Sequence, residues 1–147
     1  MKKKTPSQRR KRMDISALEK SGHMLHMEED GAMICKLNGP KDTPYEGMDF
    51  KLRITLPVQY PFRSPSVGFI GKIYHPNIDY LSGSICLNVL NQEWTPVYNL
   101  VQIIDTLLPQ LLTYPNPDDP LNETAAKLLQ ENPEEYKKQC QLKSKQT

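Results

Sequence analysis

Long hydrophobic runs are missing from this sequence of 147 residues. No stretch approaches the ~20 apolar residues that span a bilayer, and the first residues lead into further positive charge instead of an apolar signal core. These absences argue against a membrane span and predict a soluble protein of the cytoplasm or the nucleus, with no membrane partner. The length fits one domain, so we expect a single core domain over residues 7–147 and a basic arm over residues 1–12 that runs into the first helix.

Cysteine is scarce, and the three cysteines, Cys35, Cys86 and Cys140, lie far apart. An odd, widely spaced set fits neither a disulfide framework nor a paired Cys-x-x-Cys metal site. His23 and His26 have no further ligands at metal-binding spacing. The sequence therefore predicts free thiols and no metal site.

Acidic residues are absent from positions 1–12, although the chain as a whole contains 17 of them. That segment is predicted to be either a solvated, partly disordered arm or a contact for an acidic partner, such as a protein surface, nucleic acid or an import receptor. No aromatic residue separates the basic ones, which disfavours binding of single-stranded nucleic acid by stacking. The basic positions are Lys2, Lys3, Lys4, Arg9, Arg10, Lys11 and Arg12.

Proline, in contrast, is abundant, with 13 residues that nearly all lie between Pro40 and Pro133. Long uninterrupted helices are therefore excluded from the middle of the chain. Alternation of apolar and polar residues predicts strands at 33–37, 48–56 and 67–70, with 22–30 as a link before them. Short connections between these strands imply an antiparallel meander.

Helical spacing appears on both sides of this central part. A first helix is expected to be capped by Ser7 and to end near Ser21, and a buried helix over 100–112 is expected to kink or end at Pro109. Two more helices are expected to begin at Asn122 and Asn132, the latter with a capping box. The fold class is therefore α+β. The residues expected on the inward face of the first helix are Met13, Ile15, Ala17 and Leu18.

Cys86 is the candidate nucleophile. A free cysteine is more often a core residue, but the run Ser82-Gly83-Ser84 before it and Asn88 after it form a polar surround that we expect to be flexible, with the thiol within reach of a partner. A cysteine can accept an acyl group as a thioester and pass it to an amine. This setting favours acyl transfer.

His75, Pro76 and Asn77 form a stiff turn shortly before Cys86. The Asn77 amide could donate a hydrogen bond to the oxyanion of the reaction, or it could serve only the backbone of its loop; both roles are compatible. His75 is expected to be a structural residue of this loop, because its order and spacing relative to Cys86 do not match a cysteine-protease dyad.

Asp118 and Asp119 lie between Pro117 and Pro120 in a second loop stiffened by proline. If the fold brings this loop to the thiol, a carboxylate there can orient an incoming lysine amine or accept its proton. Charge attraction alone would raise the pKa of that amine, so partial desolvation is needed as well. The alternative is a solvated turn.

Five motifs follow one another along the chain: Tyr60-Pro61-Phe62, His75-Pro76-Asn77, Ile85-Cys86-Leu87, Trp94-Thr95-Pro96 and the run from Pro115 to Leu121. Together they make the sequence resemble the ubiquitin-conjugating enzyme family across almost its full length. Within the family, the run Asn77-Ile78-Asp79 before Ser82-Gly83 and the run from Leu108 to Leu112 look most like the H-type branch. The resemblance implies an N-terminal helix, a four-stranded antiparallel meander and three further helices. It also implies that Cys86 accepts ubiquitin from an activating enzyme and transfers it to substrate lysines. The activating enzyme would consume the ATP, so the protein itself is expected to need no cofactor.

The same resemblance implies roles for individual residues in a protein expected to be monomeric. Asn77 would support the oxyanion or the loop, His75 and Pro76 would support the active-site loop, and Asp119 would be the acidic gate for lysine. The implied surface for a RING-type ligase comprises Phe62, Pro96 and Val97 together with the first helix. The implied surface for the activating enzyme comprises Arg9, Arg10, Lys11 and Arg12. The competing interpretations are a non-catalytic adaptor of the same fold and a nucleic-acid binder that uses the basic arm.

Overall fold

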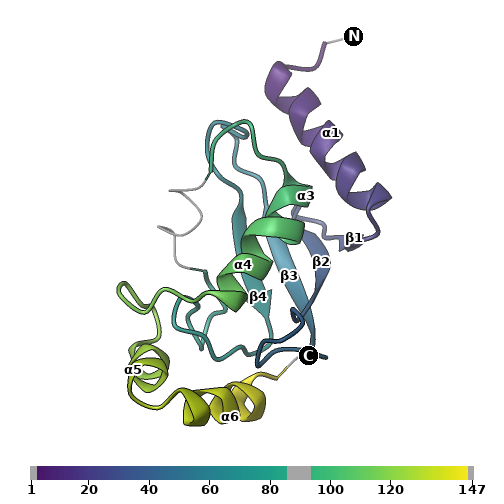
Figure 1. Ribbon diagram of the computed structural model, residues 1–147. Helices are drawn as coiled ribbons and strands as arrows, with labels where there is room; N and C mark the ends of the chain where they lie inside the picture. Colours follow the sequence, from purple (N-terminus) through teal and green to yellow (C-terminus); the bar gives the residue numbers. More distant parts are fainter. Residues whose placement is uncertain (1–2, 86–93, 146–147) are drawn as a thin grey trace.

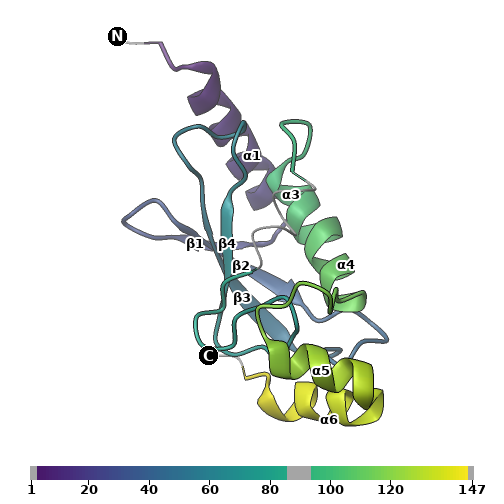
Figure 2. The ribbon, with the colours of Figure 1, turned by 90° about the vertical axis from the view of Figure 1, so that its left-hand side faces the viewer.

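The computed structural model describes residues 3–85 and 94–145, so Cys86 and Asn88 lie outside the described residues. Its centre is an antiparallel sheet with the strand order β1-β2-β3-β4. Helix α1 lies at one end of this sheet, α5 and α6 lie at the other, and α3 and α4 cross one face between them (Figures 1 and 2). The strands are β1 (Met24–Met27), β2 (Met33–Asn38), β3 (Asp49–Thr55) and β4 (Ser66–Ile70).

The three predicted strands are present, and β3 shows the expected alternation. Phe50, Leu52 and Ile54 are buried while the residues between them are exposed, and Leu52 pairs with Cys35 on β2. Strand β1 was missed, because 22–30 was expected to be only a link. Its side chains are mostly exposed, so no apolar alternation marks it in the sequence.

Helix α1 (Pro6–Lys20) is capped by Thr5, and the prediction of Ser7 as the cap was wrong. The Thr5 hydroxyl accepts the Gln8 N–H at 3.1 Å, and the Gln8 side chain accepts the Thr5 N–H at 2.8 Å, which together form a capping box. Ser7 instead donates from its hydroxyl to the Tyr60 carbonyl. The helix therefore begins earlier than expected and is fastened to the loop after β3.

The inward face of α1 is also narrower than predicted. Leu18 is buried and Ile15 is half-buried, but Met13 is 66% exposed and Ala17 is exposed, so the assignment of these two was wrong. The helix buries the charged Asp14 instead. A buried carboxylate needs partners; those of Asp14 are Arg10, four residues earlier on the same helix, and the Tyr60 hydroxyl, which helical periodicity could not reveal.

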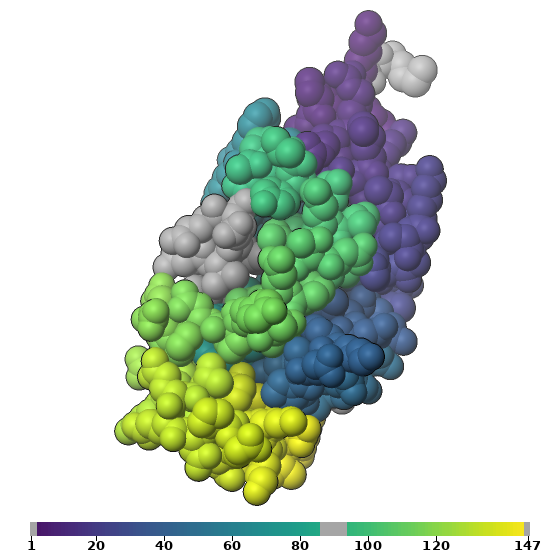
Figure 3. All heavy atoms as spheres, viewed as in Figure 1, coloured from purple at the N-terminus to yellow at the C-terminus, as the bar shows by residue number. Residues whose placement is uncertain are grey.

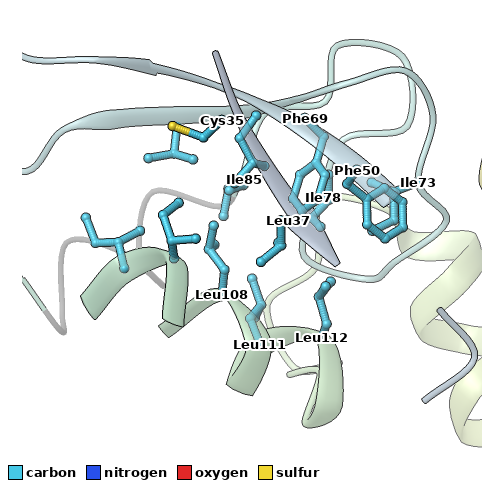
Figure 4. Packing of buried hydrophobic residues seen from close by; sticks show 14 of the residues in the cluster. Cys35, Leu37, Phe50, Phe69, Ile73, Ile78, Ile85, Leu108, Leu111 and Leu112 are labelled. Atoms are coloured by element: carbon cyan, nitrogen blue, oxygen red, sulfur yellow. The ribbon is translucent and has the colours of Figure 1, made fainter. Parts of the chain in front are cut away.

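The segment from Leu100 to Thr113 is helical throughout, as α3 (Leu100–Gln102), the π-helical η1 (Ile103–Leu107) and α4 (Leu108–Thr113). The helix does not end at Pro109, although an end there was one of the two predicted outcomes. The Leu108 N–H bonds to the Ile103 carbonyl, which is the wider π-type spacing. This change of register precedes the proline and lets the chain continue without the N–H that proline lacks. Figure 4 shows Leu108, Leu111 and Leu112 reaching from this helix into the core beneath the sheet.

Helices α5 (Glu123–Glu131) and α6 (Pro133–Lys143) begin where the sequence predicts. Their caps are Asn122 and Asn132, whose side chains accept the N–H groups of Ala125 and Glu135 at 3.0 and 3.2 Å. The predicted capping box on α6 is absent, because the Glu135 side chain accepts from Gln139 at 2.9 Å instead. Within residues 3–85 and 94–145, no helix is long and apolar enough to cross a membrane.

Candidate active site

His75 is buried and uses both of its ring nitrogens. Its Nδ1 accepts the backbone N–H of Asn77 at 3.0 Å, and its Nε2 lies 2.8 Å from the Leu111 carbonyl, which can only accept. The ring is therefore a neutral imidazole with its proton on Nε2. Burial lowers the pKa of His75 from 6.5 to about 4, which is the environment of a structural residue that joins its loop to α4.

Asn77 is also buried, and its amide is closed against the backbone of Asn116. The side-chain oxygen accepts the Asn116 N–H at 2.8 Å, and the side-chain nitrogen donates to the Asn116 carbonyl at 2.7 Å. This geometry is that of the loop-supporting role. The amide nitrogen carries two protons, and the bond to Asn116 uses one of them, so donation to an oxyanion stays a prediction.

The carbonyl of Pro76 holds the end of the segment 116–122, whose start is held by Asn77. It accepts the N–H groups of Leu121 and Asn122 at 2.9 and 3.0 Å. The turn at 75–77 therefore fastens the segment 116–122 at its start and at its end, and the light green part of Figure 3 shows this region on the surface between α4 and the yellow C-terminal helix.

Asp119, the predicted acidic gate, lies on this fastened segment and is exposed. The loop has an internal support as well, since the Asn116 side chain accepts the Asp118 N–H at 3.0 Å. The structure thus brings Asn77 and the loop of Asp119 together through backbone hydrogen bonds. How close Asp119 comes to Cys86 stays a prediction, because Cys86 lies outside the described residues.

The turn that leads to Cys86 is held by hydrogen bonds, which does not fit the flexibility expected of residues 82–84; Asn88, the other part of the expected surround, lies outside the described residues. Asp79 accepts from both the N–H and the hydroxyl of Ser82, at 2.8 and 2.6 Å, and these bonds lower the pKa of its carboxyl. The Gly83 carbonyl accepts the Phe69 N–H at 2.8 Å, which ties the turn to β4. The spacing of an aspartate three residues before a serine was a readable signal of such a turn.

Ile85, the residue before Cys86, is buried and pairs with Ile78 in an antiparallel bridge. Ile78 directly follows Asn77. The residue before position 86 is therefore held beside the turn at 75–77. Figure 4 shows both isoleucines within the core cluster.

A buried polar cluster binds the backbone directly before the turn at 75–77. The sequence patterns did not predict this cluster. The Tyr45 hydroxyl donates to the Tyr74 carbonyl at 2.5 Å and lies 3.1 Å from the Tyr136 hydroxyl and 3.5 Å from the Cys140 sulfur. Burial raises the pKa of Tyr45 well above its ordinary value. No local signal could reveal this cluster, because Tyr45 is 95 positions from Cys140.

The residues predicted to bind a ligase come together at the end of the sheet near α1. Phe62 and Val97 are 77% and 86% exposed, and Pro96 is exposed. Their two loops are joined because the Trp94 indole N–H donates to the Pro61 carbonyl at 2.9 Å. Figure 1 shows these turns beside one another at the top of the view.

The four basic residues predicted to bind the activating enzyme do not share one environment. Arg9 and Arg12 are exposed and Lys11 is half-buried on α1. The Arg10 guanidinium turns toward the body of the domain, where it forms an ion pair with Asp14 at 3.0 Å. The structure therefore separates Arg10 from its neighbours.

Residues 7–144 match the family model described as ubiquitin-conjugating enzyme, and the chain belongs to this family. It is 53% identical over 127 residues to ubiquitin-conjugating enzyme E2 5 of Arabidopsis thaliana, which covers 85% of this chain and 68% of the relative. It is 48% identical over 134 residues to the 23 kDa ubiquitin-conjugating enzyme E2 of Triticum aestivum, covering 90% of this chain and 72% of that one.

The fold agrees with solved structures of the same family. A crystal structure described as a putative ubiquitin-conjugating enzyme from Plasmodium yoelii superposes with a TM-score of 0.83 and 32% identity, over 96% of this chain and 94% of that one. The predicted α+β fold with an N-terminal helix and a four-stranded antiparallel sheet is confirmed. The protein is accordingly a ubiquitin transferase of the thioester-forming class, and its family implies ubiquitin, an activating enzyme and a ligase as partners.

Proposed function

We propose that this protein accepts ubiquitin as a thioester on Cys86 and transfers it to substrate lysines with the help of a RING-type ligase. The observation that carries the proposal is the double fastening of the segment 116–122 by Asn77 and Pro76. The same turn is followed by Ile78, which pairs with Ile85 directly before the thiol. One rigid turn thus supports both the acidic loop and the approach to the nucleophile.

The chemistry needs two acyl transfers. The Cys86 thiolate attacks the ubiquitin thioester on the activating enzyme, so that a new C–S bond forms as the old one breaks. The lysine amine then attacks the carbonyl carbon, a C–N bond forms, and the Cys86 thiolate leaves. The proton that the amine releases passes to the Asp119 carboxylate or to water. ATP is consumed only by the activating enzyme.

The other two cysteines do not suit this role. Cys35 and Cys140 are buried free thiols, and burial raises the pKa of Cys35 to about 11 and raises that of Cys140 as well. Since the thiolate is the nucleophile, a raised pKa makes a thiol inert near neutral pH. Both cysteines therefore serve as internal controls for Cys86.

The surfaces support two successive partners. The exposed basic side chains of Arg9 and Arg12, with Lys11 beside them on α1, suit an acidic surface on the activating enzyme. Phe62 and Val97 present apolar area on adjoining loops, which suits a ligase.

A gel without reductant tests the proposal. The protein is mixed with activating enzyme, ubiquitin and Mg-ATP. The parent should gain a heavier band that thiols remove, Cys86→Ala should lose it, and Cys86→Ser should give a band that resists thiols. Cys35→Ala should retain the parent's behaviour. A folded parent that never gains the band would refute the transferase and leave the adaptor.

A further inference from the structure

The Arg10 side chain connects α1 to the turn that bears the proposed ligase-binding residues. Its Nη1 donates to the Pro96 carbonyl at 2.7 Å, and its Nη2 donates to the Tyr98 carbonyl. These acceptors lie 86 and 88 positions along the chain. One side chain therefore holds two points on the backbone of this turn.

The guanidinium is itself held in place by buried groups. Its Nε donates to Asp14 at 3.0 Å, and its plane lies over the Tyr60 ring at 5.7 Å. Asp14 is buried and also accepts the Tyr60 hydroxyl. Because Asp14 and Tyr60 hold the guanidinium on one side, its remaining N–H donors have a fixed direction. The planar fork of arginine fits this geometry, and the single ammonium group of lysine does not.

The two sides of the proposed ligase surface meet at this arginine. Tyr60 precedes Pro61, whose carbonyl accepts the Trp94 indole N–H at 2.9 Å, and Phe62 follows. The turn that contains Pro96 has an internal hydrogen bond, from the Tyr98 N–H to the Thr95 carbonyl at 3.0 Å. That bond shapes the turn but does not set its position relative to Phe62, whereas Arg10 and Trp94 do.

The other arginines of α1 do not make this connection. Arg12 is exposed, and the exposed Arg9 donates to the Lys4 carbonyl at 3.2 Å, within its own segment. Arg9 therefore provides a matched control: it has the same charge, lies on the same helix and is next in sequence.

We infer that Arg10 is a positioning residue for ligase-stimulated transfer, because it holds Pro96 and Val97 at the place where a RING domain would contact them together with Phe62. This inference rests on the proposed function. It assigns Arg10 a role distinct from that of Arg9 and Arg12, which are exposed. Loss of the Arg10 contacts should weaken the response to a ligase without removing the chemistry at Cys86.

The test compares discharge of the ubiquitin thioester to free lysine with and without a RING domain. A panel of purified RING domains is screened, and the one that accelerates the parent most is used throughout. In Arg10→Lys the ratio of the two rates should fall about fivefold or more, since the pre-ordered contact surface is lost. Unstimulated discharge of the thioester should change less than about twofold.

The control variant and a second measurement make the result specific. Arg9→Lys, which keeps the charge as Arg10→Lys does, should keep the parent's ratio. The chain has one tryptophan, Trp94, so its fluorescence should shift in Arg10→Lys and not in Arg9→Lys, and the amides of 97–99 should exchange faster. If Arg10→Lys is poorly folded, Arg10→Met combined with Asp14→Asn removes both charges and should show the same loss of ratio.

The outcomes separate the two proposals. A parent that no RING domain accelerates would overturn the ligase part of the proposed function and this inference with it. A parent that is accelerated, with a folded Arg10→Lys accelerated equally, would overturn this inference alone. Equal losses in Arg9→Lys and Arg10→Lys, which both keep the positive charge, would also overturn it, because the loss would then not depend on the contacts of Arg10.

Discussion

Replacing Asn77 by alanine is the most direct perturbation of the active-site support. The change removes two hydrogen bonds of 2.8 and 2.7 Å to the backbone of Asn116. Each such bond contributes about 0.5–1.5 kcal/mol, so the free energy of unfolding should fall by about 1–3 kcal/mol. For a chain of this size each kcal/mol lowers the melting temperature by about 2–4 °C.

The local effect should be confined to the fastened loop. The Asn116 N–H would lose its acceptor, and hydrogen exchange over 115–118 should accelerate roughly 5- to 150-fold, which corresponds to the same free energy. The bonds from Leu121 and Asn122 to the Pro76 carbonyl remain. Charging of Cys86 should survive, while discharge to lysine should slow because Asp119 is held less firmly.

Asn116→Ala is the matched control for this experiment. It keeps the backbone groups that Asn77 contacts and removes only the 3.0 Å bond from the Asp118 N–H, so its effect on stability should stay below about 1.5 kcal/mol. Unchanged exchange over 115–118 in a folded Asn77→Ala protein would refute the loop-support reasoning. Slowed discharge with unchanged exchange would assign Asn77 to the oxyanion directly.

Three further predictions concern buried or tightly packed positions. Folded His75 has a pKa of about 4 instead of 6.5, so the unfolded state binds the proton first as the pH falls. The fold is therefore destabilised progressively from pH 6.5 to pH 4, by about 3 kcal/mol in all. The urea midpoint of unfolding should vary less over this range in His75→Gln than in the parent. Gly83→Ala places a Cβ 2.0 Å from the Phe69 carbonyl oxygen at φ +78°, so unfolding should become easier by about 2–5 kcal/mol, against about 1 kcal/mol for Gly47→Ala. Tyr45→Phe should lower thermal stability by about 1–3 kcal/mol, since buried partners lose their bonds.

Each of these has an outcome that would contradict it. Equal pH dependence in the parent and in His75→Gln would show that the ring is not a buried neutral group. Similar melting temperatures for the alanine variants of Gly83 and Gly47, which has no atom within 4 Å of its Cβ position, would remove the steric argument. A Tyr45→Phe protein as stable as the parent would show that the hydroxyl is dispensable.

Much of the fold could be read from local patterns. The alternation in β3 and the asparagine caps of α5 and α6 depend on residues within a few positions of each other. The same local rules misplaced the cap of α1, because Ser7 and Thr5 are both good cap residues and Ser7 has a distant partner at Tyr60. They could not foresee the π-helical turn before Pro109, which depends on how the helix packs.

The candidate site likewise has features that the sequence predicts and features that only the tertiary structure shows. The residue types at Cys86, Asn77 and Asp119 are sufficient to predict acyl transfer, since thiol, amide and carboxylate chemistry belongs to the side chains themselves. Only the tertiary structure decided that the Asn77 amide closes on Asn116, 39 positions away, and that Arg10 turns from its basic neighbours to the Pro96 carbonyl. The physical reason is range: caps, turns and alternation act between near neighbours in the chain, whereas the partner of a buried amide or guanidinium is chosen by packing, which no local pattern encodes.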